Sequence, residues 1–389
     1  MVLAEIAGVF AVLGVAQAIA GFILVKNFAR QPEISMSSTP CALPPVTVLK
    51  PLCGDEPLLE HALQSCFSQS YPEFQIVFGV HHAADPALKA VERLRQRFPN
   101  RDIEVVIDPT IHGINRKLSN LINMLPFAKH DILVISDSDL HVPHHYLGSL
   151  VAELATPGTG LVTSLYFGRP PTREGWARTL GATQINHIFL PGVLVSRALG
   201  RQDCLGSTAM MSRSTLERIG GFRPLANVLA EDNVMGQLVR DLGLSIGLAG
   251  IVPAAIVPES TLAAVWQHEI RWVRTIRELA PALLCASTLQ HPLFWSLIAM
   301  LVSGFAAWPV ALFFFCWAVR AACADGIDRA LSNRLGLPPF STPFWLLPVR
   351  DVLSVVEIAA SFLVNEVTWR GHKMAASGAV ASPGQRARE

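Results

Sequence analysis

ILVISDSD, residues 132–139, is an apolar run that ends in two aspartates, Asp137 and Asp139. A short apolar run that is rich in β-branched residues is typical of a buried strand. Because two carboxylates one residue apart repel each other, they favour a bound cation, and Mg²⁺ or Mn²⁺ can also bridge a diphosphate. Asp and Ser at a strand end equally favour turns and helix caps, so the motif alone leaves both interpretations open.

Other β-rich runs and helix-like segments alternate around this stretch. The β-rich runs are 46–49, 74–80, 103–107 and 131–136, and helix-like segments include 58–67, 86–98 and 116–124. This alternation predicts an α/β domain with βαβ units and a mainly parallel sheet, extending from about residue 45 to 258. Such a sheet binds its ligand beyond the carboxyl ends of its strands, so polar residues directly after strands are the candidate site residues.

Two further segments of this kind carry groups suited to a nucleotide. Asp85 follows the run 74–80, and its carboxylate can hold a base or a ribose. The segment 112–120 joins a strand to a helix and contains Lys117 among amide and basic side chains. A solvated turn is the alternative interpretation of that segment.

A second acidic pair, Glu231 and Asp232, comes after the turn Gly220-Gly221 and before the helical pattern 234–242. Either acid could simply cap that helix, because carboxylates are favourable at helix N-termini. The functional interpretation makes one of them a general base that deprotonates an acceptor hydroxyl.

An amphipathic helix is expected after residue 259, because apolar residues from Leu262 to Ile276 recur at helical spacing. Its polar side carries Gln267, His268, Arg271, Arg274 and Glu278. One interpretation is an interfacial helix whose arginines reach lipid headgroups. In the other, Arg271 binds the leaving diphosphate, since a planar guanidinium matches phosphate oxygens, and Trp272 lines the acceptor pocket.

The composition indicates that part of the chain lies in a membrane. Of the 389 residues, 51% are hydrophobic and 16% are charged, against roughly a quarter charged in soluble domains. A net charge of +1 argues against a strongly basic nucleic-acid binder. The seven cysteines form no CxxC pair, and we expect reduced thiols in a cytoplasm-facing protein.

Residues 3–25 are apolar apart from Glu5 and Gln17, long enough to span a bilayer. Lys26 and Arg30 after this run predict that the following domain faces the cytoplasm.

A second apolar stretch, 292–319, is expected to form one tilted span that ends at Arg320. The stretch 344–364 contains Arg350, Asp351 and Glu357, so a re-entrant or interfacial helix and a true span both remain open.

The predicted organisation therefore has five parts. They are a transmembrane anchor (1–30), a catalytic domain (45–258), an amphipathic interfacial helix (259–290), C-terminal membrane segments (291–374) and a disordered tail (375–389).

Taken together, the motifs resemble those of the ceramide glucosyltransferase-like enzymes, glycosyltransferase family 21. The resemblance covers nearly the whole chain and rests on the segments 51–57, 85–87, 113–115, 136–139, 231–232 and 268–272. In that family three aspartates precede a Gln/Arg-x-x-Arg-Trp motif, and they correspond here to Asp85, Asp137 and Asp232, followed by Arg271 and Trp272. His268 departs from the family pattern, and Asp139 completes an Asp-x-Asp that the animal ceramide enzymes lack.

Within the family, the segments 184–187 and 201–206 resemble the bacterial hopanoid-associated glycosyltransferases. The resemblance implies a membrane-held nucleotide-diphospho-sugar transferase domain of the GT-A type at the cytoplasmic face of a bacterial inner membrane. It implies inverting transfer of N-acetylglucosamine from UDP-GlcNAc to bacteriohopanetetrol. A ceramide glucosyltransferase that uses UDP-glucose is the alternative enzyme. A lipid-binding membrane scaffold is the non-enzymatic alternative, although a scaffold does not require carboxylates at several strand and helix ends.

The residue patterns and the family resemblance together predict the role of each site residue. Asp232 is the general base, Asp137 and Asp139 hold Mg²⁺ or Mn²⁺, and Asp85 and Lys117 position the nucleotide. In the helix motif, Arg271 adds positive charge at the phosphates, whereas His268 and Trp272 belong to the acceptor side.

Overall fold

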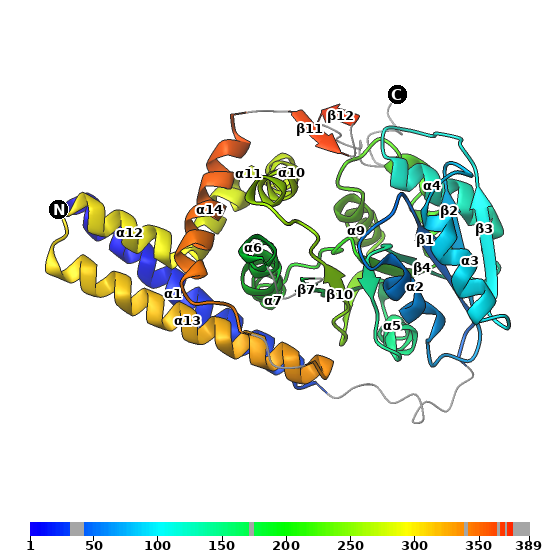
Figure 1. Ribbon diagram of the computed structural model, residues 1–389, viewed down its shortest axis with the longest axis horizontal. Coiled ribbons are helices and arrows are strands. Elements are labelled where there is room, and N and C mark those ends of the chain that lie inside the picture. Colours follow the sequence, from blue (N-terminus) through cyan, green and yellow to red (C-terminus); the bar gives the residue numbers. More distant parts are fainter. Residues whose placement is uncertain (32–42, 171–174, 338–340, 364–365, 370–371, 376–389) are drawn as a thin grey trace. The chain divides into compact units, whose positions relative to one another are not determined.

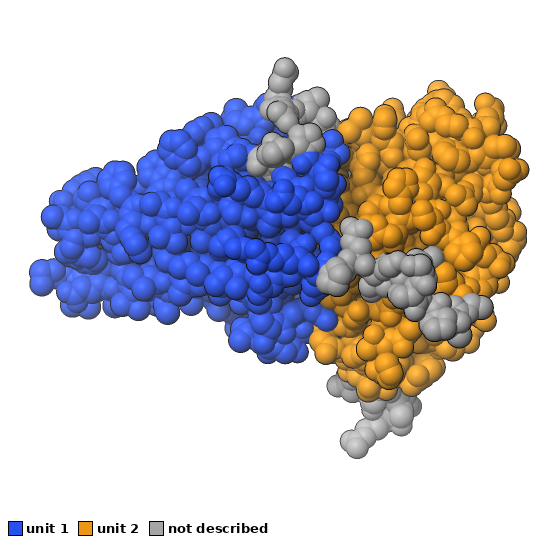
Figure 2. All heavy atoms as spheres, turned by 90° about the horizontal axis from the view of Figure 1, so that it is seen from below, with its two compact units in different colours: residues 1–31, 167–201, 257–376 blue, residues 32–166, 202–256, 377–389 orange. Residues whose placement is uncertain are grey.

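The computed structural model describes residues 1–31, 43–170, 175–337, 341–363, 366–369 and 372–375. The chain divides into two compact units, which Figure 2 colours separately. Unit 1 contains residues 1–31, 167–201 and 257–376, and unit 2 contains residues 32–166, 202–256 and 377–389. Residues 167–201 lie inside the predicted catalytic segment 45–258 but group with the apolar helices of unit 1. Residues 376–389 of the predicted tail lie outside the described residues.

Unit 2 is built on a seven-stranded sheet with the order β3-β2-β1-β4-β8-β6-β9 (Figure 1). The strands are β1 (Val46–Pro51), β2 (Phe74–Val80), β3 (Asp102–Ile107), β4 (Ile132–Ser136), β6 (Thr159–Ser164), β8 (Thr208–Ser212) and β9 (Ser245–Ala249). The β1–β2, β1–β4, β2–β3 and β6–β9 pairs are parallel. Only β8 pairs antiparallel, with β4 and β6. The prediction of a mainly parallel sheet is confirmed.

Helices cover both faces of this sheet. The helices are α2 (Leu59–Phe67), α3 (Ala87–Arg97) and α5 (Tyr146–Leu154) on one face, and α4 (Arg116–Met124), α8 (Arg213–Arg218) and α9 (Glu231–Asp241) on the other. Along β4, Val134 packs into the first hydrophobic core, whereas Leu133 and Ile135 pack into the second. Because both faces are buried, the strand reads as a continuous apolar run and not as an alternating one.

The strand order changes direction at β1. The chain passes from β1 to β2 and β3 on one side, and β4 then pairs with the other side of β1. Such a switch point opens a crevice beyond the carboxyl ends of the strands. Asp137 and Asp139 directly follow β4 at this edge, and Lys50 occupies the end of β1. The short strand β5 (Leu140–His141) then pairs antiparallel with β10 (Ala254–Ile256).

Unit 1 is mainly helical. Its elements are α1 (Val2–Ala29), β7 (Phe167–Arg169), α6 (Trp176–Gln184), the π-helix η3 (Ile185–Phe189), α7 (Leu190–Ala198), α10 (Leu262–Leu279), α11 (Pro281–Ala286), η5 (Ser287–Gln290), α12 (Pro292–Val302), α13 (Ala307–Leu335), α14 (Leu346–Ser361), β11 (Glu366–Trp369) and β12 (His372–Ala375). The helices α1, α12 and α13 pack side by side (Figure 1). The predicted amphipathic helix is present as α10.

Among the described residues, α1 and α13 are long and apolar enough to cross a membrane, and the segment 281–302 passes the same test only as a pair bent by 74°. The prediction of one span over 292–319 is wrong. The chain breaks between α12 and α13, where Gly304 and Phe305 have φ angles of 63° and 62°. Left-handed residues end a helix, and α13 then continues past Arg320 to Leu335.

The 16-residue helix α14 is not among the candidate spans of the described chain. Its three charged residues, Arg350, Asp351 and Glu357, are fully buried. They are compensated inside unit 1, since Arg350 pairs with Glu357 and Asp351 lies near Arg320. The charges that interrupt the apolar pattern are therefore internal contacts of the fold.

Candidate active site

Lys117 connects the aspartates after β4 with the acidic pair of α9. Its ammonium group lies 2.7 Å from Asp137 Oδ1 and 3.4 Å from Glu231 Oε1. Burial alone would lower the pKa of Lys117, but the two carboxylates raise it further above its usual range. Lys117 is therefore a fixed positive charge at the carboxyl edge of the sheet, as expected for a group that positions phosphates.

Asn115 caps the helix that carries Lys117 and binds Glu231 directly. Its side-chain oxygen accepts a hydrogen bond of 3.1 Å from Leu118 N, which caps α4. Its amide nitrogen donates to Val228 O at 2.9 Å and to Glu231 Oε2 at 3.1 Å. The capping role was readable from an Asn directly before a helix. The bond to Glu231 was not, because 116 residues separate the partners.

Asp232 lies in the first turn of α9, which begins at Glu231 and not at residue 234 as predicted. Its Oδ1 accepts a hydrogen bond of 2.8 Å from Asn233 N. Gly206 approaches Asp232 so closely that a Cβ at this glycine would lie 2.6 Å from Asp232 Oδ2, and its φ is 79°. Only glycine satisfies both conditions. Lys117, Glu231 and Asp232 share the lining of one small cavity with Gly206.

The two adjacent carboxylates of α9 have different surroundings. Burial, followed by the charge of Glu231, raises the pKa of Asp232 to about 7. Glu231 is instead bound by Asn115 and lies beside Lys117. A carboxyl group that titrates near neutral pH is suited to accept a proton during catalysis. The geometry therefore favours Asp232 over Glu231 as a base.

Asp139 is the second carboxylate of the predicted metal pair. Burial, followed by the charges of Asp137 and Glu56, raises its pKa to about 7. Glu56 accepts a 2.6 Å hydrogen bond from Ser138 Oγ, and buried Lys50 donates to the carbonyl of Asp137. Lys50 was not among the predicted site residues, and Glu56 was part of the family segment 51–57 but had no predicted role. Nothing in their local pattern indicates contact with a loop more than 80 residues away.

These groups fit Mg²⁺ or Mn²⁺ only where substrate phosphates and water supply the remaining ligands of the ion. In the described residues no group of three or more His, Cys, Asp or Glu side chains is arranged to hold a metal ion. Mg²⁺ typically takes one or two protein carboxylates together with substrate phosphates and water. Asp137 and Asp139, the two carboxylates directly after β4, match that requirement.

Asp85 binds backbone amides. Its oxygens accept from Gly54 N at 3.0 and 3.1 Å and from Ala87 N at 2.9 Å. It thereby fastens the loop after β1 to the start of α3. Within the described residues, no hydrogen bond or ion pair joins Asp85 to Lys117 or Asp137.

The helix motif lies on α10 in unit 1 and is described by itself. His268 binds Glu259, and its ring meets Trp272 edge-on with centroids 4.5 Å apart. Arg271 is half-buried on the same helix. Glu269, which the sequence analysis did not single out, is buried and pairs with Arg350 at 2.7 Å.

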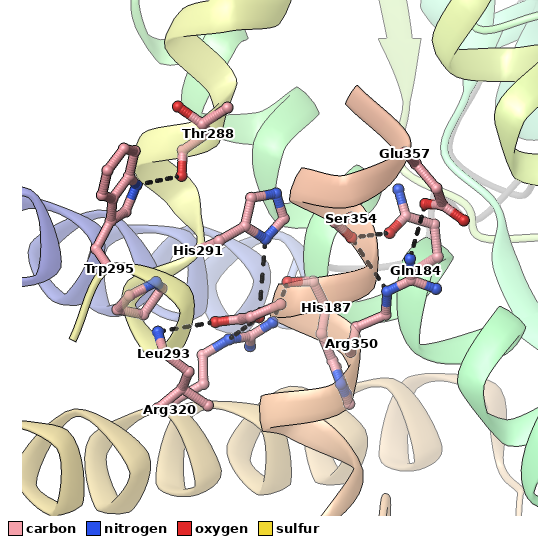
Figure 3. A network of polar contacts seen from close by, with 12 residues as sticks. Gln184, His187, Thr288, His291, Leu293, Trp295, Arg320, Arg350, Ser354 and Glu357 are labelled. Atoms are coloured by element: carbon pink, nitrogen blue, oxygen red, sulfur yellow. Dashed lines mark hydrogen bonds and ion pairs between the residues drawn. The ribbon is translucent and has the colours of Figure 1, made fainter. Parts of the chain in front are cut away.

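Arg350 also contacts Glu357 at 3.0 Å and donates to Ser354 Oγ at 3.1 Å (Figure 3). The buried guanidinium of Arg350 therefore links α10, the helix that carries the motif, to α14.

Comparison with known proteins identifies similar sequences. The family model described as Glycosyl transferase family 21 matches residues 7–379. Ceramide glucosyltransferase 1 of Caenorhabditis elegans is 23% identical over 338 residues, which cover 85% of this chain and 71% of that protein. The ceramide glucosyltransferase of Pyricularia oryzae is 23% identical over 445 residues, which cover 92% and 90%.

Among solved structures, the mannosyltransferase PcManGT from Pyrobaculum calidifontis, in complex with GDP-Man and Mn²⁺, is similar to this chain. The TM-score is 0.51 and the identity 20%, over 92% of this chain and 99% of that one. At this identity the likeness concerns the fold. It confirms the predicted α/β fold of the GT-A type.

Proposed function

We propose, from the premise that this chain belongs to glycosyl transferase family 21, that it transfers a sugar from a nucleotide-diphosphate donor to a hydroxyl group of a membrane lipid. The observation that carries the proposal is the convergence of Asp232, Lys117 and Asp137 at the carboxyl edge of the sheet. A base, a fixed cation and a metal-binding carboxylate are the groups that glycosyl transfer from a diphosphate requires. A non-catalytic scaffold does not account for this convergence.

The chain's own residues account for a single inverting displacement. Asp232 removes the proton of the acceptor hydroxyl as its oxygen attacks the anomeric carbon from the face opposite the diphosphate. Lys117 stabilises the charge that develops on the leaving diphosphate, and Arg271 adds a guanidinium to it. When bound by Asp137 and Asp139, Mg²⁺ or Mn²⁺ supplies further positive charge at the phosphates. Asp85 positions the nucleotide through the loop that it fastens.

The acceptor side is proposed from unit 1 and from the relatives. Two apolar helices long enough to cross a membrane and relatives named ceramide glucosyltransferase support a lipid acceptor. His268 and Trp272, joined edge to face on α10, are proposed to line the acceptor pocket. We propose the bacterial inner membrane as the location, with unit 2 in the cytoplasm.

Two donor–acceptor pairs compete. The resemblance at 184–187 and 201–206 favours UDP-GlcNAc with bacteriohopanetetrol, whereas the names of the relatives favour UDP-glucose with ceramide. The test combines each donor with each lipid in mixed micelles that contain the purified full chain, and detects the product by mass spectrometry. We expect N-acetylglucosaminyl-bacteriohopanetetrol. A glucosylated ceramide as the sole product would establish the alternative, and no product from any of the four combinations would contradict the proposal.

The metal is tested in the same assay. EDTA should abolish transfer, and Mn²⁺ or Mg²⁺ should restore it, because the donor phosphates need a cation that Lys117 alone does not replace. Asp139→Asn should raise the metal concentration needed for half-maximal rate while leaving the thermal midpoint within a few degrees. Full activity in chelator, with metal shown to be absent, would refute the assignment of Asp137 and Asp139.

A further inference from the structure

A cavity inside unit 1 is lined by polar side chains from segments far apart in the sequence. They are Gln17 on α1, His187 in η3, Gln290 in η5 and Arg320 on α13. The remaining lining is apolar or backbone, including Gly192 on α7. The cavity volume is about 20 Å³, which accommodates one group the size of a hydroxyl or a water molecule.

Two residues that line this cavity each have a buried nitrogen without a hydrogen-bond partner in the described part of the chain. They are His187, through Nδ1, and Arg320, through Nε, which lies 3.7 Å from Asp351 Oδ1. The other ring nitrogen of His187 lies 2.6 Å from Asp328 Oδ1. The terminal nitrogen of Arg320 donates to His187 O at 3.3 Å, and Figure 3 shows the two residues as neighbours. Buried polar groups in folded proteins are normally paired, so this pair indicates a ligand with a polar atom.

Two helices that are long and apolar enough to cross a membrane contribute polar residues to the cavity. Gln17 interrupts the apolar run of α1, and Arg320 directly follows the apolar residues 307–319 of α13. Polar groups between spanning helices must be satisfied by protein or by a polar ligand, because lipid offers no hydrogen bonds. The π-helix at 185–189 contains His187, and single π-turns of this kind are frequent at functional sites.

Charge compensation decides the chemistry of the ligand. The imidazole of His187 faces Asp328, and Arg320 Nε lies 3.7 Å from Asp351 Oδ1. These carboxylates offset the positive charge, so the cavity does not favour an anion such as phosphate. The carboxamides of Gln17 and Gln290 both donate and accept. A neutral hydroxyl group, which also donates and accepts, matches this lining.

We propose that the cavity binds a hydroxyl group at the polar end of the lipid that receives the sugar. The site selects lipids with a hydroxyl group that can donate and accept hydrogen bonds. The inference rests on the proposed lipid glycosyl transfer, because that function supplies the hydroxylated lipid.

Filling the cavity is the direct test. A Cβ at Gly192 would meet only Gln290 Oε1, at 3.5 Å, an ordinary contact. Gly192→Leu should therefore place its side chain in the cavity, and Gly192→Ala is the milder version. Gln17→Leu removes one carboxamide, and Asn27→Leu, an exposed position on the same helix, is the matched control. His187 and Arg320 are left unchanged because they also hold buried carboxylates.

The readouts separate this site from the transfer reaction. In mixed micelles with bacteriohopanetetrol or ceramide, Gly192→Leu and Gln17→Leu should raise the KM for the lipid about tenfold or more, the effect of one lost hydrogen bond of roughly 1.4 kcal/mol. The KM for the nucleotide sugar and its slow hydrolysis without lipid should not change. Asn27→Leu should leave all three unchanged.

A binding assay keeps the inference independent of catalysis. Retention of labelled lipid by the purified chain without donor should fall in Gly192→Leu and less in Gly192→Ala, and excess glycerol or phosphate should not displace the lipid. If lipid retention depends on Gly192 but no sugar is transferred, the proposed glycosyl transfer is contradicted and the hydroxyl-binding cavity is not. An unchanged lipid KM and unchanged retention in both Gly192→Leu and Gln17→Leu would show that the cavity holds only water.

Discussion

At the scale of single residues, the function depends on two adjacent carboxylates that the fold treats differently. Asn115 and Lys117 hold Glu231, whereas Asp232 is bound by the amide of its neighbour Asn233 and faces Gly206. An alcohol attacks poorly at neutral pH unless it loses its proton during attack. A positioned base therefore contributes roughly 10²–10⁴-fold to the rate.

The variant Asp232→Asn should lose that factor in kcat while it keeps donor affinity, because the amide retains size and hydrogen bonding but not proton affinity. Glu231→Gln, the matched control one residue away, should keep most of its turnover. Donor affinity by calorimetry and transfer rate are measured for both variants. Near-normal turnover in Asp232→Asn together with a collapse in Glu231→Gln would move the base to Glu231.

The pH dependence follows from the same environment. Burial and then the charge of Glu231 raise the pKa of Asp232 to about 7, so the carboxyl group is protonated below that pH and cannot act as a base. The value of kcat/KM should therefore rise with pH up to about 7 and then level off. In Glu231→Gln this rise should move to lower pH, because the raising charge is gone. A profile that does not move in this variant would contradict the assignment.

At the scale of secondary-structure elements, one buried guanidinium fixes the motif helix. Arg350 of α14 binds Glu269 of α10 and Glu357 of its own helix. Burial raises the pKa of both Glu269 and Glu357, that of Glu357 to about 9, so the two carboxyl groups retain one proton between them at neutral pH and Arg350 balances the remaining negative charge. Removing the guanidinium leaves a buried carboxylate without a partner.

Arg350→Met should therefore destabilise the protein by about 3–5 kcal/mol, as expected when one partner of a buried ion pair is lost. Adding Glu269→Gln should recover a large part of this loss, since no uncompensated charge then remains. Arg329→Met, which breaks an exposed i,i+4 pair with Asp325, is the control and should change stability by at most about 0.5 kcal/mol. Thermal unfolding in detergent compares these three variants with the unaltered protein. Equal midpoints for Arg350→Met and Arg329→Met would refute the role of the pair.

The elements show what local sequence can predict. Strand β4 and helix α4 lie close to their predicted positions, because continuous apolar runs and helical spacing are local signals. The break at Gly304 was missed, since Ser303 and Gly304 are small, uncharged residues that leave the run apolar overall. The Glu269–Arg350 pair joins residues 81 positions apart, and no local pattern indicates such contacts. The same applies to the contact of Glu231 with Asn115.

At the scale of the whole molecule, the two units are interleaved along the chain. The sequence passes between them near residues 31, 166, 201 and 256. Unit 1 therefore folds from segments on both sides of the segments that form unit 2. Long-range contacts of this kind are costly to form early in folding, and both units depend on them, since β4 pairs with β8 across the unit 1 segment 167–201.

The helices of unit 1 also constrain the topology. Near the N-terminal ends, Gly8 of α1 faces Trp308 of α13, and at the other ends Arg334 donates to the carbonyl of Gln31. The helices α1 and α13 therefore run in the same direction. If both cross the membrane, the chain between them must return across it, so the bent segment 281–302 is the third crossing.

Labelling of single cysteines tests this topology. Lys26 and Arg30 at the end of α1 predict that this side is cytoplasmic. In a background with Cys41→Ser and Cys285→Ser, an impermeant maleimide should label exposed Cys53 in inverted vesicles but not in intact spheroplasts. Buried Cys66, whose thiol pKa is raised by burial, should stay unlabelled in both until the protein is denatured.

In the further variant Cys53→Ser/Ser303→Cys, the new thiol lies at the break between α12 and α13 and should show the opposite accessibility. Labelling of Cys53 from outside would reverse the orientation, whereas labelling of positions 53 and 303 from the same side would show that 281–302 and α13 do not both cross.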